Sequence, residues 1–287
     1  MSNSIQVRML GGFSIMYDGE EVVLNSNSTL KYMLLLQLML LKGAGNSQGL
    51  SKNQLVTALY EGADVSNSNN SVNNLLYQLR RQLSKAGLPG GDYIVRSGDR
   101  YVLSPELNVK VDAREFETDL KAAADEPDES RRILLYRKAF DLYGGELLPR
   151  ANTEMWVIVE SVRLERLYKE CVEQLADYYR SQSDYTVLEH IYQRAAKACP
   201  CDRWEIGWID TLVERGDYKQ AYQAYDNMVR TYMEEMGGSP TPEMLLCYER
   251  IGEHMKHLPG RIETICAEIA DYTEAGAEAW GGVFLQL

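Results

Sequence analysis

Residues 69–86 read NNSVNNLLYQLRRQLSKA, and this stretch decides how the first part of the chain is interpreted. At about 100° per residue, its large apolar side chains fall on one face of a helix. They are Val72, Leu75, Leu76, Leu79 and Leu83. Gly87 follows, with Pro89 beyond it, which is typical of a helix end. The stretch therefore predicts an amphipathic helix with one buried face and one polar face.

Polar and basic side chains occupy the face opposite the leucines. They are Asn67, Asn70, Asn74, Tyr77, Gln78 and Arg81, with Asn73 and Arg80 on one flank. An Asn amide can form two hydrogen bonds with adenine in the major groove, and Arg residues late in the helix can contact phosphate. Alternatively, the Asn residues only solvate and cap the helix start, and the Arg residues are surface charges that the helix dipole favours.

The segments around this helix have the order of a winged helix. We predict strands at 5–10, 13–17 and 22–24, helices at 30–41, 52–60 and 69–86, and a hairpin of strands at 93–96 and 100–103. Asp18-Gly19 is a hairpin turn pair, Ser28 or Thr29 can cap the first helix, and Ser51 can cap the second. In a winged helix the third helix lies in the major groove and the hairpin forms the wing beside it.

Basic residues outside the third helix complete a candidate DNA-binding set. Arg96 and Arg100 flank the wing turn, where they either reach the DNA backbone or minor groove or are ordinary charges at strand ends. Lys31 starts the first helix against its dipole, which indicates an external anion. The full set is Lys31, Asn67, Asn70, Asn73, Asn74, Tyr77, Arg80, Arg81, Arg96 and Arg100. If DNA binds here, the five cations of this set should converge around the third helix.

The net charge of −12 argues against nucleic acid only when the chain is taken as a whole. Residues 1–110 hold 10 Lys and Arg against 8 Asp and Glu, a net charge of +2, whereas residues 111–287 hold 20 against 34, a net charge of −14. Residues 66–110 carry a net charge of +3, from 6 basic and 3 acidic residues. This modest charge predicts weak binding by a monomer, so we expect a homodimer, tandem binding or help from a polymerase.

Beyond Pro105 the pattern is nearly all helical. Helices are predicted at 112–124, 130–143, 153–181, 184–198, 202–214, 218–236 and 241–257. Asp184-Tyr185 and the residues after it align with Asp217-Tyr218, a spacing of 33 residues, close to the ~34 of a tetratricopeptide (TPR) repeat. An acidic helical array of this kind is typically a binding surface for proteins.

The sequence contains no motif typical of a metal site, a phosphate-binding loop or a catalytic nucleophile. Cys199-Pro200-Cys201 offers two thiols one residue apart, which does not match the four ligands of structural zinc, and no phosphate-binding loop or nucleophile motif occurs. We therefore expect no metal, no cofactor and no enzymatic activity. The five cysteines are an odd set, and neither a secretory signal nor a run of about 20 apolar residues is present, so a cytoplasmic location away from membranes is expected.

Several motifs in this order resemble the SARP family of transcriptional regulators. In the first part they are 7–13 (VRMLGGF), 50–55 (LSKNQL) and 74–83 (NLLYQLRRQL), which resemble an OmpR/PhoB-type winged helix. In the second part they are 111–116 (VDAREF), 142–149 (LYGGELLP) and 234–251, which resemble the TPR-like bacterial transcriptional activator domain. Family members often carry several basic residues just before the first helix; in this chain Lys31 is the only one there.

The resemblance implies an α+β winged helix followed by an all-α TPR-like domain, in a regulator that binds double-stranded DNA and contacts RNA polymerase. By analogy, the loop at 61–66 touches polymerase. We expect domains at 1–108 and 111–257, and a C-terminal extension at 258–287 that is either a dimerisation tail or the start of a further domain. The alternative function is a protein-interaction scaffold whose winged helix binds DNA weakly or not at all.

Overall fold

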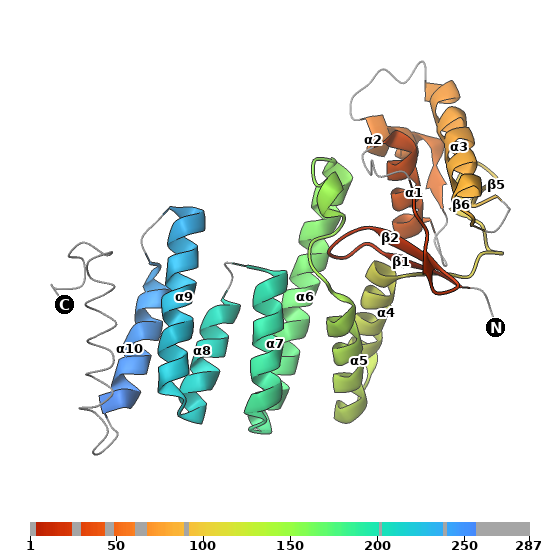
Figure 1. Cartoon of the computed structure of the whole chain (residues 1–287). Coiled ribbons are helices and arrows are strands. Elements are labelled where there is room, and N and C mark those ends of the chain that lie inside the picture. Colours follow the sequence, from red (N-terminus) through yellow and green to blue (C-terminus); the bar gives the residue numbers. More distant parts are fainter. Residues whose placement is uncertain are drawn as a thin grey trace. The chain divides into compact units, whose positions relative to one another are not determined.

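The computed structural model describes residues 4–24, 30–43, 49–60, 68–88, 92–200, 203–237 and 240–256. Its contacts divide the chain into two compact units. The first comprises residues 1–183 with 197–200, and the second comprises 184–196 with 201–287. Figure 1 shows the elements of both units in sequence colours. The C-terminal extension at 258–287 and the loop at 61–66 lie outside the described residues.

The chain begins with a four-stranded sheet. Its strands are β1 (Ile5–Arg8), β2 (Ser14–Tyr17), β3 (Glu20–Glu21) and β7 (Val109–Val111), in the order β3-β2-β1-β7. The predicted turn is confirmed, because Asp18 and Gly19 both have positive φ, of 52° and 87°, as a type I′ hairpin turn requires. The third strand is two residues earlier than predicted, since a tight turn continues the pairing at once through Glu20 and Glu21.

A winged helix follows this sheet, as predicted (Figure 1). Its elements are α1 (Lys31–Lys42), β4 (Leu50–Ser51), α2 (Lys52–Tyr60), α3 (Ser68–Lys85), β5 (Ile94–Ser97) and β6 (Arg100–Leu103), with β4-β6-β5 as a second sheet. Ser51 and Gln54 form a reciprocal capping box before α2: Ser51 N donates to Gln54 Oε1 at 2.8 Å, and Gln54 N donates to Ser51 Oγ at 3.3 Å. The predicted cap of this helix is therefore confirmed.

Helix α1 is buried on all sides, since every residue from Tyr32 to Leu41 is buried. It ends at Gly43, where the Gly43 N–H donates to Met39 O at 2.7 Å. Its N-cap is Leu30, whose side chain makes no cap hydrogen bond, and the predicted caps Ser28 and Thr29 lie outside the described residues. A helix buried this fully gains its stability from packing rather than from a cap.

The helices after β7 are α4 (Asp112–Asp125), α5 (Glu129–Leu142) and α6 (Met155–Ser181), with the short 3₁₀ helix η2 (Pro149–Ala151) before α6. Aromatic rings form their core. Tyr143 and Tyr168 stack with centroids 4.0 Å apart, and Phe116 and Phe140 lie 5.5 and 5.7 Å from Tyr143 and Tyr168, respectively. Stacked and tilted aromatic pairs of this kind add to the apolar burial that holds the three helices together.

The second unit is helical throughout its described residues. It contains most of α7 (Tyr185–Ala198), together with α8 (Trp204–Arg215), α9 (Tyr218–Met236) and α10 (Pro242–Lys256). The predicted repeat is reflected in the helix starts, because α7 and α9 begin at the aligned residues Tyr185 and Tyr218. An apolar core links α8, α9 and α10 through residues such as Leu212, Tyr225 and Cys247.

None of the described helices combines the length and the apolar character that a membrane span requires. Among the same residues, no three His, Cys, Asp or Glu side chains gather where they could hold a metal ion.

Candidate nucleic-acid interface

Helix α3 has one buried face and one exposed face. Its five apolar residues, Val72, Leu75, Leu76, Leu79 and Leu83, are all buried against the winged-helix core, as the periodicity predicted. On the other face the exposed residues are Asn73, Asn74, Tyr77, Gln78, Arg80 and Arg81. Because a helix presents side chains 3 and 4 residues apart on the same side, these residues form one continuous polar surface.

The Asn and Tyr residues of the candidate set are accessible where they are described. Asn73 and Asn74 are exposed, and Tyr77 is 65% exposed, an unusual state for a large aromatic ring. Asn70 belongs to α3, and Asn67 lies outside the described residues. The accessible amides and the phenol supply hydrogen-bond donors and acceptors on a helix that is otherwise anchored by leucines.

Arg80 and Arg81 follow on the same surface, one helical turn later. Arg80 Nε lies 3.0 Å from Asp92 Oδ1, and both side chains are at least half exposed. Arg81 is exposed. The Asp92 carboxylate partly neutralises Arg80, so Arg81 is the cation of α3 that is better placed to meet a phosphate.

The two wing arginines have different surroundings. Arg96 is exposed in β5, and its Nε donates to Gly98 O in the turn at 2.9 Å. Arg100 is half-buried in β6, and its Nη1 donates to Gly49 O at 3.1 Å, which attaches the segment before β4 to the wing. Arg96 is therefore available at the wing tip, whereas Arg100 also holds the small sheet together.

Lys31 has partners within the protein. Its Nζ donates to Leu59 O at the end of α2, lies 5.5 Å from the centroid of the Tyr60 ring, and is 4.0 Å from Glu154 Oε2. A cation at a helix C-terminus is favoured by the helix dipole. The anion partner inferred from the position of Lys31 is thus provided by a carbonyl and a carboxylate of the chain, and a contact with DNA stays a prediction.

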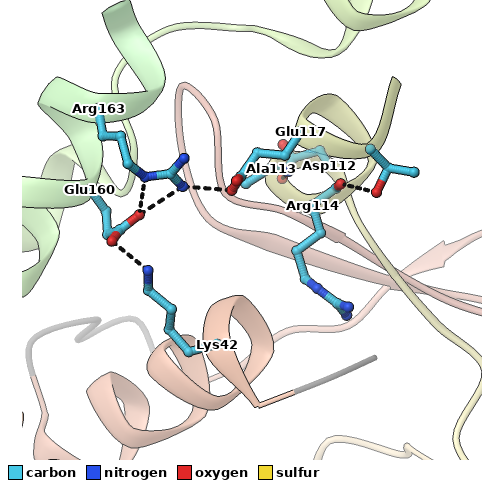
Figure 2. Close-up of polar contacts among 8 residues, drawn as sticks. Lys42, Asp112, Ala113, Arg114, Glu117, Glu160 and Arg163 are labelled. Atoms are coloured by element: carbon cyan, nitrogen blue, oxygen red, sulfur yellow. Dashed lines mark hydrogen bonds and ion pairs between the residues drawn. The ribbon is translucent and has the colours of Figure 1, made fainter. Parts of the chain in front are cut away.

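An ion-pair network that sequence reasoning missed connects α1 of the winged helix to α4 and α6. Figure 2 shows Lys42 of α1 pairing with Glu160 of α6, and Arg163 bridging Glu160 to Glu117 of α4. The Arg163 guanidinium is 2.9 Å from Glu160 and 2.7 Å from Glu117. Burial alone would raise the pKa of the Glu160 carboxyl. The hydrogen bonds and positive charges of Lys42 and Arg163 outweigh that effect, so the pKa is lowered. No local pattern indicates this network, since its members come from three distant segments.

Asp112 makes a second connection, between the first sheet and α4. Its carboxylate accepts hydrogen bonds from the backbone N–H groups of Met9 and Leu10 at 2.8–3.0 Å and from that of Ala113 at 2.7 Å. Burial raises the pKa of Asp112 to about 6, against the opposing effect of these hydrogen bonds. The motif at 111–116 provided the signal for this residue, although not for its partners.

Comparison with known proteins identifies the second part of the chain. The family model described as bacterial transcriptional activator domain matches residues 111–251. A search of curated proteins finds no match.

Comparison of folds adds a solved structure, that of Mycobacterium tuberculosis EmbR in complex with a low-affinity phosphopeptide. It superposes with a TM-score of 0.57 at 17% sequence identity, and the alignment covers 96% of this chain and 72% of the EmbR chain. At this low sequence identity the comparison shows a similar fold only. The similarity extends over both the winged helix and the helices that follow it. Residues 111–251 thus match the bacterial transcriptional activator domain, and they follow an amino-terminal winged helix in a fold similar to that of the EmbR chain.

Proposed function

We propose that the protein is a non-enzymatic transcriptional regulator that reads double-stranded DNA with α3 and contacts the DNA backbone with the wing. The observation that carries this proposal is the two-sided character of α3, with a fully buried leucine face and an accessible face of Asn73, Asn74, Tyr77 and Arg81. Amides and a phenol on an exposed helix suit base edges, and the following arginine suits phosphate. Arg96 at the wing tip extends the same role to the neighbouring backbone.

The acidic second part supports a role in protein contact rather than in DNA contact. Residues 111–287 carry a net charge of −14, which repels phosphate. We infer that the activator domain contacts RNA polymerase or a second copy of the chain, and by family analogy the loop at 61–66 takes part in the polymerase contact. Acting on nucleoid DNA and polymerase, the protein would work in the cytoplasm.

An apolar strip on α6 favours the homodimer. Met155, Ile158, Val159 and Val162 follow one another at helical spacing, and each is between 40% and 64% exposed. A contiguous apolar patch on a helix is typical of a protein interface. Sedimentation velocity tests this: Val162→Asp should leave only the monomer at concentrations where the parent chain is dimeric, whereas Lys138→Glu on α5 should not change the mass.

Selection of bound genomic fragments by the full chain, followed by titration of the selected site, tests the DNA-binding function. We expect Asn74→Ala to weaken binding to the selected site by ~10-fold or more, while binding to unrelated DNA changes little. Lys138→Ala, an exposed lysine on α5, is the matched control and should bind both DNAs as the parent chain does.

The scaffold function is the second candidate, and the internal partners of Lys31, Arg80 and Arg100 favour it, because they leave few free cations for phosphate. Failure to enrich any genomic sequence, together with equal weak binding of parent and Asn74→Ala chains, would support the scaffold over the regulator.

A further inference from the structure

A cavity of about 520 Å³ lies between the winged helix and the start of the activator domain. Phe13 beside β2, Met33 and Gln37 on α1, and Leu148 and Arg150 near η2 are among the residues that line it. The volume falls within the range of small-molecule sites, about 300–1,000 Å³. A molecule held here would touch both α1, in the winged helix, and the segment that leads into α6.

Gln37 is the unusual member of this lining. It is fully buried, and neither its Oε1 nor its Nε2 has a hydrogen-bond partner among the residues that the structure describes. The other side chains from residue 33 to residue 41 are all Leu or Met, so Gln37 interrupts a continuous apolar run. A buried amide without partners destabilises the protein relative to an apolar residue of similar shape. A ligand that pairs with this amide removes that penalty.

The surroundings of Gln37 define the chemistry of such a ligand. The amide offers one acceptor and two donors, so its complement is a group with a donor and an acceptor side by side, as in a carboxamide or a lactam. Phe13, Met33 and Leu148 supply apolar walls for a planar body. Glu21 and Arg150 are the charged residues among the described lining, and because their charges are opposite the site suits a neutral molecule.

We propose that this cavity binds a neutral small molecule with a planar apolar body and a carboxamide or lactam edge that pairs with Gln37. Two hydrogen bonds to one amide fix the orientation of the ligand, and the apolar walls supply the contact area. The proposed site depends only on the cavity and on Gln37, so its test is independent of whether the protein binds DNA.

The test uses the full chain with isotope-labelled methyl groups and two probes, 2-quinolone and N-methyl-2-quinolone. The first has an N–H beside its carbonyl, and the second lacks that donor. We expect 2-quinolone to shift the methyl signals of Met33, of Leu148 and of Val22, which also lines the cavity, in NMR spectra, and N-methyl-2-quinolone to bind ~10-fold more weakly. Absence of shifts at these methyl groups, or equal affinity for the two probes, would overturn the proposal.

Two variants give a second readout. Gln37→Leu removes the unpartnered amide, so it should raise the midpoint of thermal unfolding by ~2–4 °C and weaken 2-quinolone binding by ~10-fold. Gln78→Leu, on the exposed face of α3, is the matched control and should leave 2-quinolone binding unchanged. If Gln37→Leu instead lowers the unfolding temperature while 2-quinolone binds as before, the amide has a structural role and the proposal is wrong.

Discussion

The Lys42 ammonium, in the last turn of α1, pairs with the Glu160 carboxylate in the second turn of α6. The pair belongs to a chain of charges, because Arg163 connects Glu160 to Glu117 on α4 (Figure 2). The Glu160 side chain is only 13% exposed, so solvent screens the pair less than it would at an open surface. Charge pairing therefore joins the helix at the centre of the winged helix to the activator domain.

A double-mutant cycle measures the strength of this connection. Lys42→Ala and Glu160→Ala should each lower the free energy of unfolding, with a coupling energy of about 1 kcal/mol between them in urea titrations. The control is Glu165 with Lys169, a pair at i,i+4 whose side chains are both about one-third or more exposed and which should couple by ~0.3–0.5 kcal/mol. Coupling no larger than in this control would contradict the network.

The hydrogen bonds of Asp112 predict a stability effect at the junction of the first sheet and α4. Asp112→Ala leaves the N–H groups of Met9 and Leu10 without their acceptor, so the free energy of unfolding should fall by ~1–3 kcal/mol. Asp128→Ala is the matched control, because Asp128 also accepts a backbone hydrogen bond at a helix start, but in an exposed position, and about 1 kcal/mol is expected there. Equal losses for the two variants would show that the buried bonds add nothing.

The same residue predicts a pH dependence. Burial raises the folded-state pKa of Asp112 to about 6, whereas an unfolded aspartate titrates near 3.9, so the folded protein binds more protons between these values. The stability that Asp112 contributes should therefore fall as the pH rises from about 4 to about 6. The difference in unfolding free energy between the parent and Asp112→Ala should be larger at about pH 4 than at about pH 7. A difference that grows with pH would contradict the raised pKa.

The contacts of Lys31 and Arg81 predict opposite consequences of their removal. Arg81→Ala should weaken DNA binding for all sequences and reduce the salt dependence by about one counterion, without a change in stability. Lys31→Ala removes the contact with Leu59 O and should lower the free energy of unfolding by ~1 kcal/mol while leaving the salt dependence unchanged. Salt titrations and urea unfolding of both variants check this. A reduced salt slope in Lys31→Ala would move that lysine to the DNA interface.

Replacing Gly207 in α8 by alanine should destabilise the protein, although helix propensity alone predicts the reverse. A Cβ on Gly207 would lie 2.7 Å from the Tyr192 ring, closer than two carbon atoms can pack. Gly207→Ala should therefore lower the free energy of unfolding by ~1–3 kcal/mol, although alanine favours a helix interior by about 1 kcal/mol over glycine. Gly252→Ala on α10 is the control, since its Cβ would meet open space, and it should be neutral or stabilising. A stabilised Gly207→Ala chain would contradict the close approach.

The sequence by itself determined the features that depend on local periodicity and caps. The leucine face of α3, the capping box of Ser51 and Gln54, the turn at Asp18-Gly19 and the aligned starts of α7 and α9 all follow from residues within a few positions of one another. Such patterns are readable because helix and hairpin geometry repeats over short distances.

Only the tertiary structure decided which distant segments meet. Strand β7, which follows the winged helix in the sequence, pairs in parallel with β1. Lys31 contacts the end of α2 and Glu154, and Gln37 lines a cavity without a partner among the described residues. Periodicity places each of these side chains on a face of its own element, but the partner on that face is chosen by the packing of the whole unit. The polar surface of α3 was therefore predictable from the sequence, whereas the charge network and the cavity behind it were not.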